Sequence, residues 1–444
     1  MQKPPIPSHR EAFRFWLKLG LISFGGPAGQ IAIMHQELVE KRRWISERRF
    51  LHALNYCMLL PGPEAQQLAT YIGWLLHGVR GGITAGVLFV LPAFFLLCLL
   101  SWIYVSYSHL PVVAGIFYGI KPSVTAIVLQ AVYRIGGRTL KNPALWGIAA
   151  CSFLALFALD APFPLIVLCA ALAGLAGSRL VPAYFSGSGH EAGVQKDYGP
   201  AVIDDAMDSE GRTRFSFVDL AKVLIVGLIL WCMPMAVLMF WGGWGHPFTQ
   251  MGWFFTKAAF LTFGGAYAVL PYVFQAAVEH YQWLSAPQMI DGLALGETTP
   301  GPLILVVAFV GFVGGHGAAS FGPEWASLSG FIGAGIVTWF TFLPSFLFIL
   351  GGAPIVEATH GNMKFTAPLT AITAAVVGVI LNLALFFAYH VLWPQGFEGA
   401  FDIFSAVLTV LAAVALLVFK RSVLTVIGAS ALIGLIFSFV VTLF

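Results

Sequence analysis

The chain has 444 residues, of which 59% are hydrophobic and 10% are charged, with a mean hydropathy of +0.85 and a net charge of +3. A soluble domain carries about 25% charged residues, so the composition excludes an ordinary soluble protein and predicts an all-α polytopic membrane protein. The small charge excess gives no reason to expect a nucleic-acid partner. The five cysteines stand singly in apolar segments. This spacing argues against a disulfide framework and against a metal site, and we expect no cofactor.

Apolar runs recur along the whole chain, and a bilayer crossing needs about 20 such residues. In chain order the runs are Gly82–Tyr107, Pro111–Tyr133, Pro143–Leu180 (long enough for two crossings), Val218–Trp241, Ile332–Leu350, Ala371–Val391, Phe404–Phe419 and Val423–Phe444. Two earlier segments, Phe13–Gln36 and Phe50–His77, are interrupted by Gly25-Gly26-Pro27 and by Pro61-Gly62-Pro63.

The sequence contains two copies of one unit. At an offset of 239 residues, Phe24-Gly25-Gly26 falls on Phe263-Gly264-Gly265, and Pro61-Gly62-Pro63 falls on Pro300-Gly301-Pro302. After an insertion near 314–325 the offset becomes 252. We therefore predict four parts, namely an N-terminal repeat (1–185), a cytoplasmic hydrophilic linker (186–216), a connecting transmembrane helix (217–242) and a C-terminal repeat (243–444).

Basic residues predict the orientation, because Lys and Arg are enriched in cytoplasmic loops. The clusters 41–49 and 134–141 can share one side only if one of the three segments between them does not cross. Phe50–His77 is the natural candidate, since proline lacks an amide hydrogen and glycine permits a sharp turn. Phe13–Gln36 is broken similarly, and its return to its own side keeps Lys3–Lys18 in the cytoplasm. We predict a cytoplasmic N-terminus, a periplasmic C-terminus and two inverted repeats. This gives about nine full spans and about four re-entrant segments, or roughly 10–13 membrane segments by count.

Inverted repeats with broken helices predict a secondary transporter whose site lies where the repeats meet. A broken helix exposes amides at the positive end of the helix dipole, and both features attract anions. The predicted substrate-binding residues at the breaks are Gly25, Gly26, Pro61, Gly62, Pro63, Gly264, Gly265, Thr299, Pro300, Gly301 and Pro302. The alternative interpretation is that the glycine pairs mark close helix packing and the Pro-Gly-Pro turns mark simple kinks.

Lys18 and Lys257 each lie seven residues before the first glycine of a break, and so would share a helix face with it. A charge within an apolar segment is costly and indicates function by default. We predict that these two ammonium groups surround a dianionic substrate. The alternative is that the long side chains reach out to the membrane interface.

Three further groups are candidates for coupling or for the transport pathway. Glu64 and Glu297 flank the Pro-Gly-Pro turns, where protonation of a carboxylate could couple protons to transport; the alternative role is helix capping. Lys121 falls on Thr373 in the other copy, so it is not a symmetric feature, and a pathway role and a structural role both stay open.

These motifs resemble the chromate ion transporter family, often called ChrA proteins, in its two-domain form. The resemblance rests on Phe24-Gly25-Gly26-Pro27, Lys41-Arg42-Arg43-Trp44, Leu60-Pro61-Gly62-Pro63 with Tyr71-Ile72-Gly73, Phe263-Gly264-Gly265 and Thr299-Pro300-Gly301-Pro302.

The resemblance implies chromate efflux across the bacterial inner membrane and hence chromate resistance, with the oxoanion and the lipid bilayer as partners. Sulfate or another oxoanion is an alternative substrate, because sulfate is also a tetrahedral dianion. A passive anion channel and a membrane enzyme such as a chromate reductase are alternative functions. The oligomeric state stays open.

Overall fold

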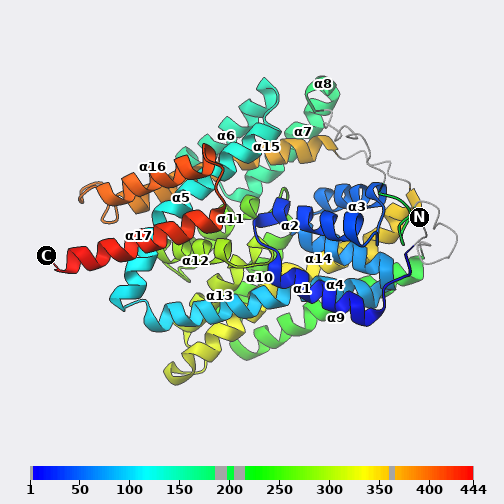
Figure 1. Cartoon of the computed structure of the whole chain (residues 1–444), viewed down its shortest axis with the longest axis horizontal. Coiled ribbons are helices and arrows are strands. Elements are labelled where there is room, and N and C mark those ends of the chain that lie inside the picture. Colours follow the sequence, from blue (N-terminus) through cyan, green and yellow to red (C-terminus); the bar gives the residue numbers. More distant parts are fainter. Residues whose placement is uncertain (1–3, 186–197, 205–215, 360–365, 444) are drawn as a thin grey trace.

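The computed structural model describes residues 4–185, 198–204, 216–359 and 366–443. Apart from an isolated bridge between Ile45 and Ile203, the regular elements in these ranges are helices. The prediction of an all-α polytopic membrane protein is confirmed. Most helices run along the long axis of the molecule, with α1 starting at one end and α17 finishing at the other (Figure 1).

The first copy contains α1 (His9–Ile22), α2 (Gly26–His35), η1 (Gln36–Lys41), α3 (Glu47–Leu59), α4 (Glu64–Tyr107), α5 (Pro111–Thr139), α6 (Pro143–Leu159), α7 (Phe163–Leu180) and α8 (Pro182–Phe185). The connecting helix is α9 (Phe217–Gly242). The second copy contains α10 (Pro247–Leu261), α11 (Ala266–Phe274), η3 (Gln275–His280), α12 (Ala286–Thr298), η4 (Leu303–Leu305), α13 (Val306–Ala318), η5 (Pro323–Trp325), α14 (Ala326–Thr359), α15 (Thr366–Leu392), α16 (Ile403–Leu417) and α17 (Val423–Leu443).

The helix boundaries repeat with the sequence offset. Helices α3 and α12 both begin and end 239 residues apart, and so do the π-helical turns η1 and η3. Arg43 and Gln282, also 239 residues apart, are two of the non-glycine residues with positive φ. The duplication therefore reaches the level of individual backbone angles.

Both broken segments of the first copy return to the end of the molecule from which they start. The guanidinium of Arg42, which follows η1, lies 5.0 Å from the ring centroid of Phe15 and pairs with Glu11 on α1 at 3.4 Å. His77, at the end of the second broken segment, contacts the carbonyl oxygen of Pro7 at 2.8 Å. We call this end, which carries Arg42 and Arg49, the basic end.

Helix α4 is a hairpin of two helical limbs rather than one rod. His77 and Gly78 leave helical geometry, with φ of −137° and 64°. The limbs pack so closely that a Cβ built on Gly73 would lie 2.5 Å from the Gly81 carbonyl oxygen. The equivalent reversal in the second copy runs from α13 to α14 through residues 319–325, which is where the sequence carries its insertion.

Equivalent long helices of the two copies run antiparallel. The second limb of α4 faces α14, with Gly82 against Leu350 and Gly86 against Phe346. Further along, Phe94 meets Phe331 with ring centroids 5.8 Å apart. Residue numbers rise along one helix as they fall along the other, so the two repeats are inverted relative to each other, as the charge pattern predicted.

Seven helices within the described residues are long and apolar enough to cross a membrane. They are α4, α5, α7, α9, α14, α15 and α17. Helices α6 and α16 have 17 and 15 residues, or about 26 and 22 Å, against a hydrocarbon core of about 30 Å. That α6 and α16 also cross the membrane, which would bring the total to the nine predicted spans, therefore stays a prediction.

The part of the predicted linker that the structure describes packs on the first copy. The amides of Val202 and Ile203 donate to the carbonyl oxygens of Arg43 and Trp44 at 2.9 and 3.0 Å, and the Ser46 amide donates to the Ile203 carbonyl at 2.9 Å. Both residues are buried. This portion is an ordered cover for the first copy, whereas the remaining predicted linker residues up to 215 lie outside the described ranges.

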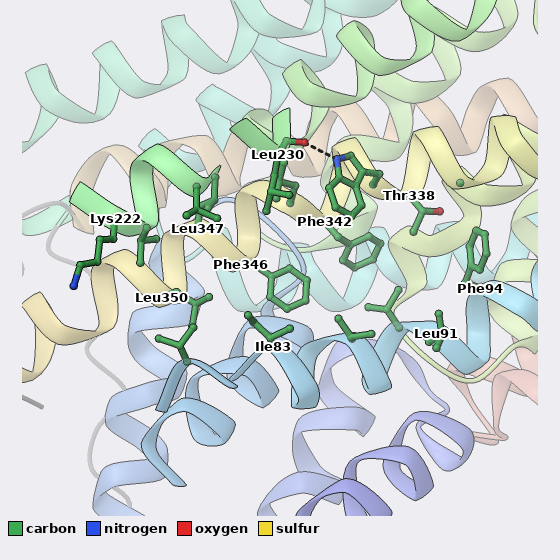
Figure 2. A pocket seen from close by; sticks show the side chains of 18 of the residues that line it. Ile83, Leu91, Phe94, Lys222, Leu230, Thr338, Phe342, Phe346, Leu347 and Leu350 are labelled. Carbon is green, nitrogen blue, oxygen red and sulfur yellow. Dashed lines mark hydrogen bonds between the residues drawn. The ribbon is translucent and has the colours of Figure 1, made fainter. Parts of the chain in front are cut away.

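Helix α9 is loosely attached, and an apolar crevice of about 680 Å³ lies between it, α4 and α14. Ile83 and Leu91 of α4 and Phe342 and Phe346 of α14 point into this space (Figure 2). Trp339 bridges to α9 by donating to the Leu230 carbonyl oxygen at 3.0 Å. The lining is largely apolar and its lysine, Lys222, pairs with Asp219 at 2.9 Å, so the crevice suits hydrocarbon rather than an oxoanion.

The hairpin of α4 gives a prediction about stability. Gly73→Ala should lower the free energy of unfolding by about 1–3 kcal/mol, because the new methyl group overpacks the two limbs. Gly147→Ala on α6 should raise it by about 0.5–1 kcal/mol, because nothing lies near that position and alanine favours helix. Unfolding in detergent measures both, and equal effects of the two variants would contradict the hairpin packing.

Candidate functional site

The helix breaks of the two copies meet through a reciprocal pair of hydrogen bonds. The amide of Gly62 donates to the carbonyl oxygen of Thr262 at 2.7 Å, and the amide of Gly301 donates to the carbonyl oxygen of Ser23 at 2.8 Å. Donors and acceptors in these two bonds are 239 residues apart. Such exchange of equivalent contacts is the mark of a two-fold interface, so the breaks lie where the predicted site was placed, between the repeats.

The Pro-Gly-Pro turns require glycine at their centres. Gly62 and Gly301 have φ of 128° and 99°, which L side chains rarely adopt. Neighbours from the other copy also close the space, since a Cβ on Gly62 would collide with the Ser345 hydroxyl, and one on Gly301 would lie 2.6 Å from Ala93 Cβ. Because proline has no amide hydrogen, the central glycine supplies the donor of each turn.

The Gly-Gly turns begin two short helices whose first amides have no side-chain cap. Helix α2 starts after Gly25 (φ 90°) and α11 starts after Gly265 (φ 92°). A Cβ built on Gly26 would meet nothing within 4 Å, and one on Gly264 would meet Thr373 at 3.6 Å. Uncapped amides beside open space provide what an anion needs at a helix N-terminus.

Three buried glutamines surround the breaks, all from the first copy. Gln30 Nε2 donates to the Gly301 carbonyl oxygen at 2.5 Å, Gln67 Nε2 donates to the Pro61 carbonyl oxygen at 2.8 Å, and Gln66 Nε2 donates to the Thr70 hydroxyl at 3.0 Å. Each Oε1 atom is buried without a hydrogen-bond partner. The counterparts of the three, Val269, Leu305 and Val306, are apolar, so the polar lining is asymmetric.

Sequence reasoning had no means to place Gln30 here. It lies 271 positions from Gly301, and its residue type alone carries no functional signal. The one clue is its counterpart Val269, because a buried polar residue facing an apolar counterpart marks a place where two copies have diverged.

Glu64 and Glu297 both lie beside the start of α11. The Oε1 atom of Glu64 is 3.9 Å from the position a Cβ on Gly265 would occupy. Glu297 accepts a hydrogen bond from the Tyr267 hydroxyl. Their counterparts are Leu303 and Met58, so these two positions bring no carboxylate to the start of α2.

The lysines predicted to surround the substrate are not seen at the breaks. Lys18 is exposed on α1, and the half-buried Lys257 has its Nζ 5.8 Å from the ring centroid of Trp253. Neither forms an ion pair with another described residue. Seven residues of helix span about 10 Å along the helix axis, and direct contact of these lysines with a bound anion stays a prediction.

Two buried ion pairs join the copies at opposite ends of the molecule. At the basic end, Arg49 on α3 pairs with Glu357 on α14 at 2.7 Å, and Tyr71 also donates to Glu357. At the opposite end, Lys121 on α5 pairs with Asp291 on α12 at 3.5 Å. The partner of Lys121 was missed from the sequence, although a lone aspartate in an apolar helix was the available signal.

Comparison of the sequence with known protein families identifies both copies. The profile of the family described as "Chromate transporter" matches residues 10–175 and 249–435. The chain belongs to the chromate transporter family. The two matched stretches correspond to the two copies, and membership implies a transporter rather than an enzyme.

Relatives of this family cover most of the chain. A "Chromate transport protein" of Pseudomonas aeruginosa is 34% identical over 383 residues, which is 85% of this chain and 80% of that protein. A "Chromate transport protein" of Cupriavidus metallidurans is 27% identical over 438 residues, or 97% of this chain and 94% of that protein. An uncharacterized transporter of Bacillus subtilis is 29% identical over 134 residues, or 30% of this chain and 68% of that protein. No solved structure matches.

The contact between Gly301 and Ala93 gives a prediction about the break. Gly301→Ala should cost about 1–3 kcal/mol of stability, since alanine is strained at this φ and collides with Ala93. Ala93→Gly alone should cost about 0.5–1 kcal/mol through loss of helix propensity. The double variant should nevertheless be more stable than Gly301→Ala, because the collision is removed. A double-mutant cycle measured by unfolding in detergent checks this, and simple additivity would contradict the contact.

Proposed function

We propose that the chain is a secondary transporter that exports chromate, a tetrahedral oxoanion, from the cytoplasm across the bacterial plasma membrane. The observation that carries the proposal is the reciprocal pair of hydrogen bonds from Gly62 and Gly301. It supports a single site between the repeats, where the broken segments of both copies meet. The names of the relatives give the substrate its chemical class.

The substrate is proposed to bind at the uncapped start of α2. This helix start has open space beside Gly26, whereas the start of α11 lies beside Glu64 and Glu297. A dianion next to ionised carboxylates would be repelled, so the two helix starts have different roles. The one at α2 holds the oxoanion, and the one at α11 carries the groups that exchange protons.

Orientation follows from the basic end, which is proposed to be cytoplasmic because Lys and Arg favour that side. Helix α17 then finishes on the periplasmic side. Lys18 and Lys257 are proposed to raise the local concentration of anions around the breaks through long-range attraction.

Chromate uptake into inverted membrane vesicles tests the transport proposal. Vesicles containing the protein should accumulate chromate. The lumen of an inverted vesicle corresponds to the periplasm, so an acidic lumen should increase the uptake if protons leaving the lumen drive chromate into it. A panel of chromate, sulfate, molybdate and phosphate in proteoliposomes separates a chromate exporter from a sulfate transporter. Flux that depends on the anion gradient alone would favour a passive channel. If the protein causes no chromate uptake either with or without an acidic lumen, the transport proposal is wrong.

The proton-coupling role gives a separate prediction. Glu64→Gln and Glu297→Gln should remove the stimulation by an acidic lumen, because neither amide can gain or lose a proton. Exchange of chromate down its own gradient should continue, within about threefold of the parent. Glu398→Gln, which changes an exposed carboxyl in the loop before α16, serves as the control and should keep the stimulation. If both glutamine variants at the breaks keep it too, coupling lies elsewhere.

A further inference from the structure

A polar pocket of about 450 Å³ lies at the end of the molecule opposite the basic end. Its polar lining comes from Tyr104, Ser108, Tyr118, Lys121, Asp291 and Ser438. The pocket has room for an oxoanion and several waters, since each water takes about 30 Å³. It lies between α4 and α5 of the first copy and α12 and α17 of the second.

The cation in this pocket is incompletely paired. Lys121 Nζ is 3.5 Å from Asp291 Oδ2, beyond the usual length of a charge-assisted hydrogen bond. That same oxygen already accepts the hydroxyl of Tyr104 at 2.9 Å. The Lys121 side chain is 29% exposed, and an ammonium group has three donors. Lys121 can therefore offer hydrogen bonds to a second anion that enters the pocket.

The anion that pairs with Lys121 is itself held imperfectly. The Asp291 side chain is 4% exposed, and its Oδ1 atom is buried without a hydrogen-bond partner among the described residues. A buried carboxylate with an unmatched oxygen is costly. The fold can form without an ion pair of this kind, because the counterparts of Lys121 and Asp291 in the other copy are Thr373 and His52.

The pocket is connected to the breaks through α12. Asp291 lies six residues before Glu297 on this helix, which corresponds to about 9 Å. The helix then leads directly into Thr299, Pro300 and Gly301. An oxoanion that moves from the breaks along α12 toward the opposite end would pass Lys121, which reaches Asp291 of α12 from α5.

We propose that Lys121 forms a second oxoanion-binding site, at which the substrate displaces the carboxylate of Asp291. The proposal rests on the function proposed above, and it deepens that function by naming an exit site. A dianion attracts the ammonium group about twice as strongly as a carboxylate at equal distance. When the oxoanion leaves, Asp291 pairs with Lys121 again, so the carboxylate acts as a tethered competitor that lowers the affinity of the site and favours release.

The test measures anion binding at this pocket directly. A cysteine replaces Ser108 in a variant whose exposed cysteines, Cys151, Cys169 and Cys232, are changed to serine. The rate at which a methanethiosulfonate reagent modifies this cysteine in purified protein is followed with increasing sulfate, which is a tetrahedral dianion that does not oxidise thiols. Sulfate should slow the modification, whereas equal ionic strength of chloride should not.

Two substitutions should act in opposite directions. Lys121→Ala should remove the protection by sulfate, whereas Asp291→Asn should lower the sulfate concentration needed for half protection by about tenfold, which corresponds to about 1.4 kcal/mol. Lys141→Ala, which removes an exposed lysine just after α5, should change nothing. Because Lys121→Ala leaves a buried carboxylate unpaired, the double variant Lys121→Ala/Asp291→Asn checks the same loss in a pocket without either charge.

Several results would overturn the exit site. They are no protection in the parent protein, weaker protection in Asp291→Asn, or protection that survives the double variant. Failure of the proposed function gives a different pattern, in which vesicles show no chromate transport while the cysteine at position 108 is still protected by sulfate through Lys121. The reverse pattern, transport without protection, leaves the function standing and removes the exit site.

Discussion

A helix broken inside a membrane leaves backbone amides and carbonyl oxygens without partners, and water is not present to replace them. Each unsatisfied group costs several kcal/mol in such surroundings. In this protein the amides of Gly62 and Gly301 are satisfied by carbonyl oxygens of the opposite copy. The breaks of one copy are therefore stable because the other copy is present, and the packing of the two repeats follows from this exchange.

The same constraint explains why the centre of the molecule is symmetric and its lining is not. The turn geometry must be kept in both copies, so the glycines and prolines repeat, and the glycines have positive φ in both copies. The side chains around the turns have diverged. The first copy has Gln30 and Gln66 where the second has Val269 and Leu305. Carboxylates gather beside α11, which is why the anion site is proposed at the start of α2.

Charged groups away from the centre follow a related pattern. Arg49 with Glu357 and Lys121 with Asp291 each join the first copy to the second, at opposite ends of the molecule. For the proposed secondary transport, we expect that opening a path to one end separates the pair at that end. Paired charges across the two copies thus provide contacts that can differ between two states, which alternating access requires.

The sequence by itself determined the membrane class, the duplication, the broken segments and the inversion. These features are local in origin, because they depend on apolar length, on motifs at a fixed offset, on the backbone limits of glycine and proline, and on the side that basic residues favour. It also located the breaks at Gly25-Gly26 and Pro61-Gly62-Pro63 and at their counterparts.

Only the tertiary structure decided which side chains join those breaks. The reversal at His77–Gly78, the approach of Gln30 to Gly301 and the pairing of Lys121 with Asp291 depend on how segments far apart in the chain pack together. Lys18 and Lys257 show what helix spacing alone cannot predict, since a shared helix face did not determine what either ammonium group contacts. Spacing along one helix fixes direction, whereas contact across two repeats is fixed by packing.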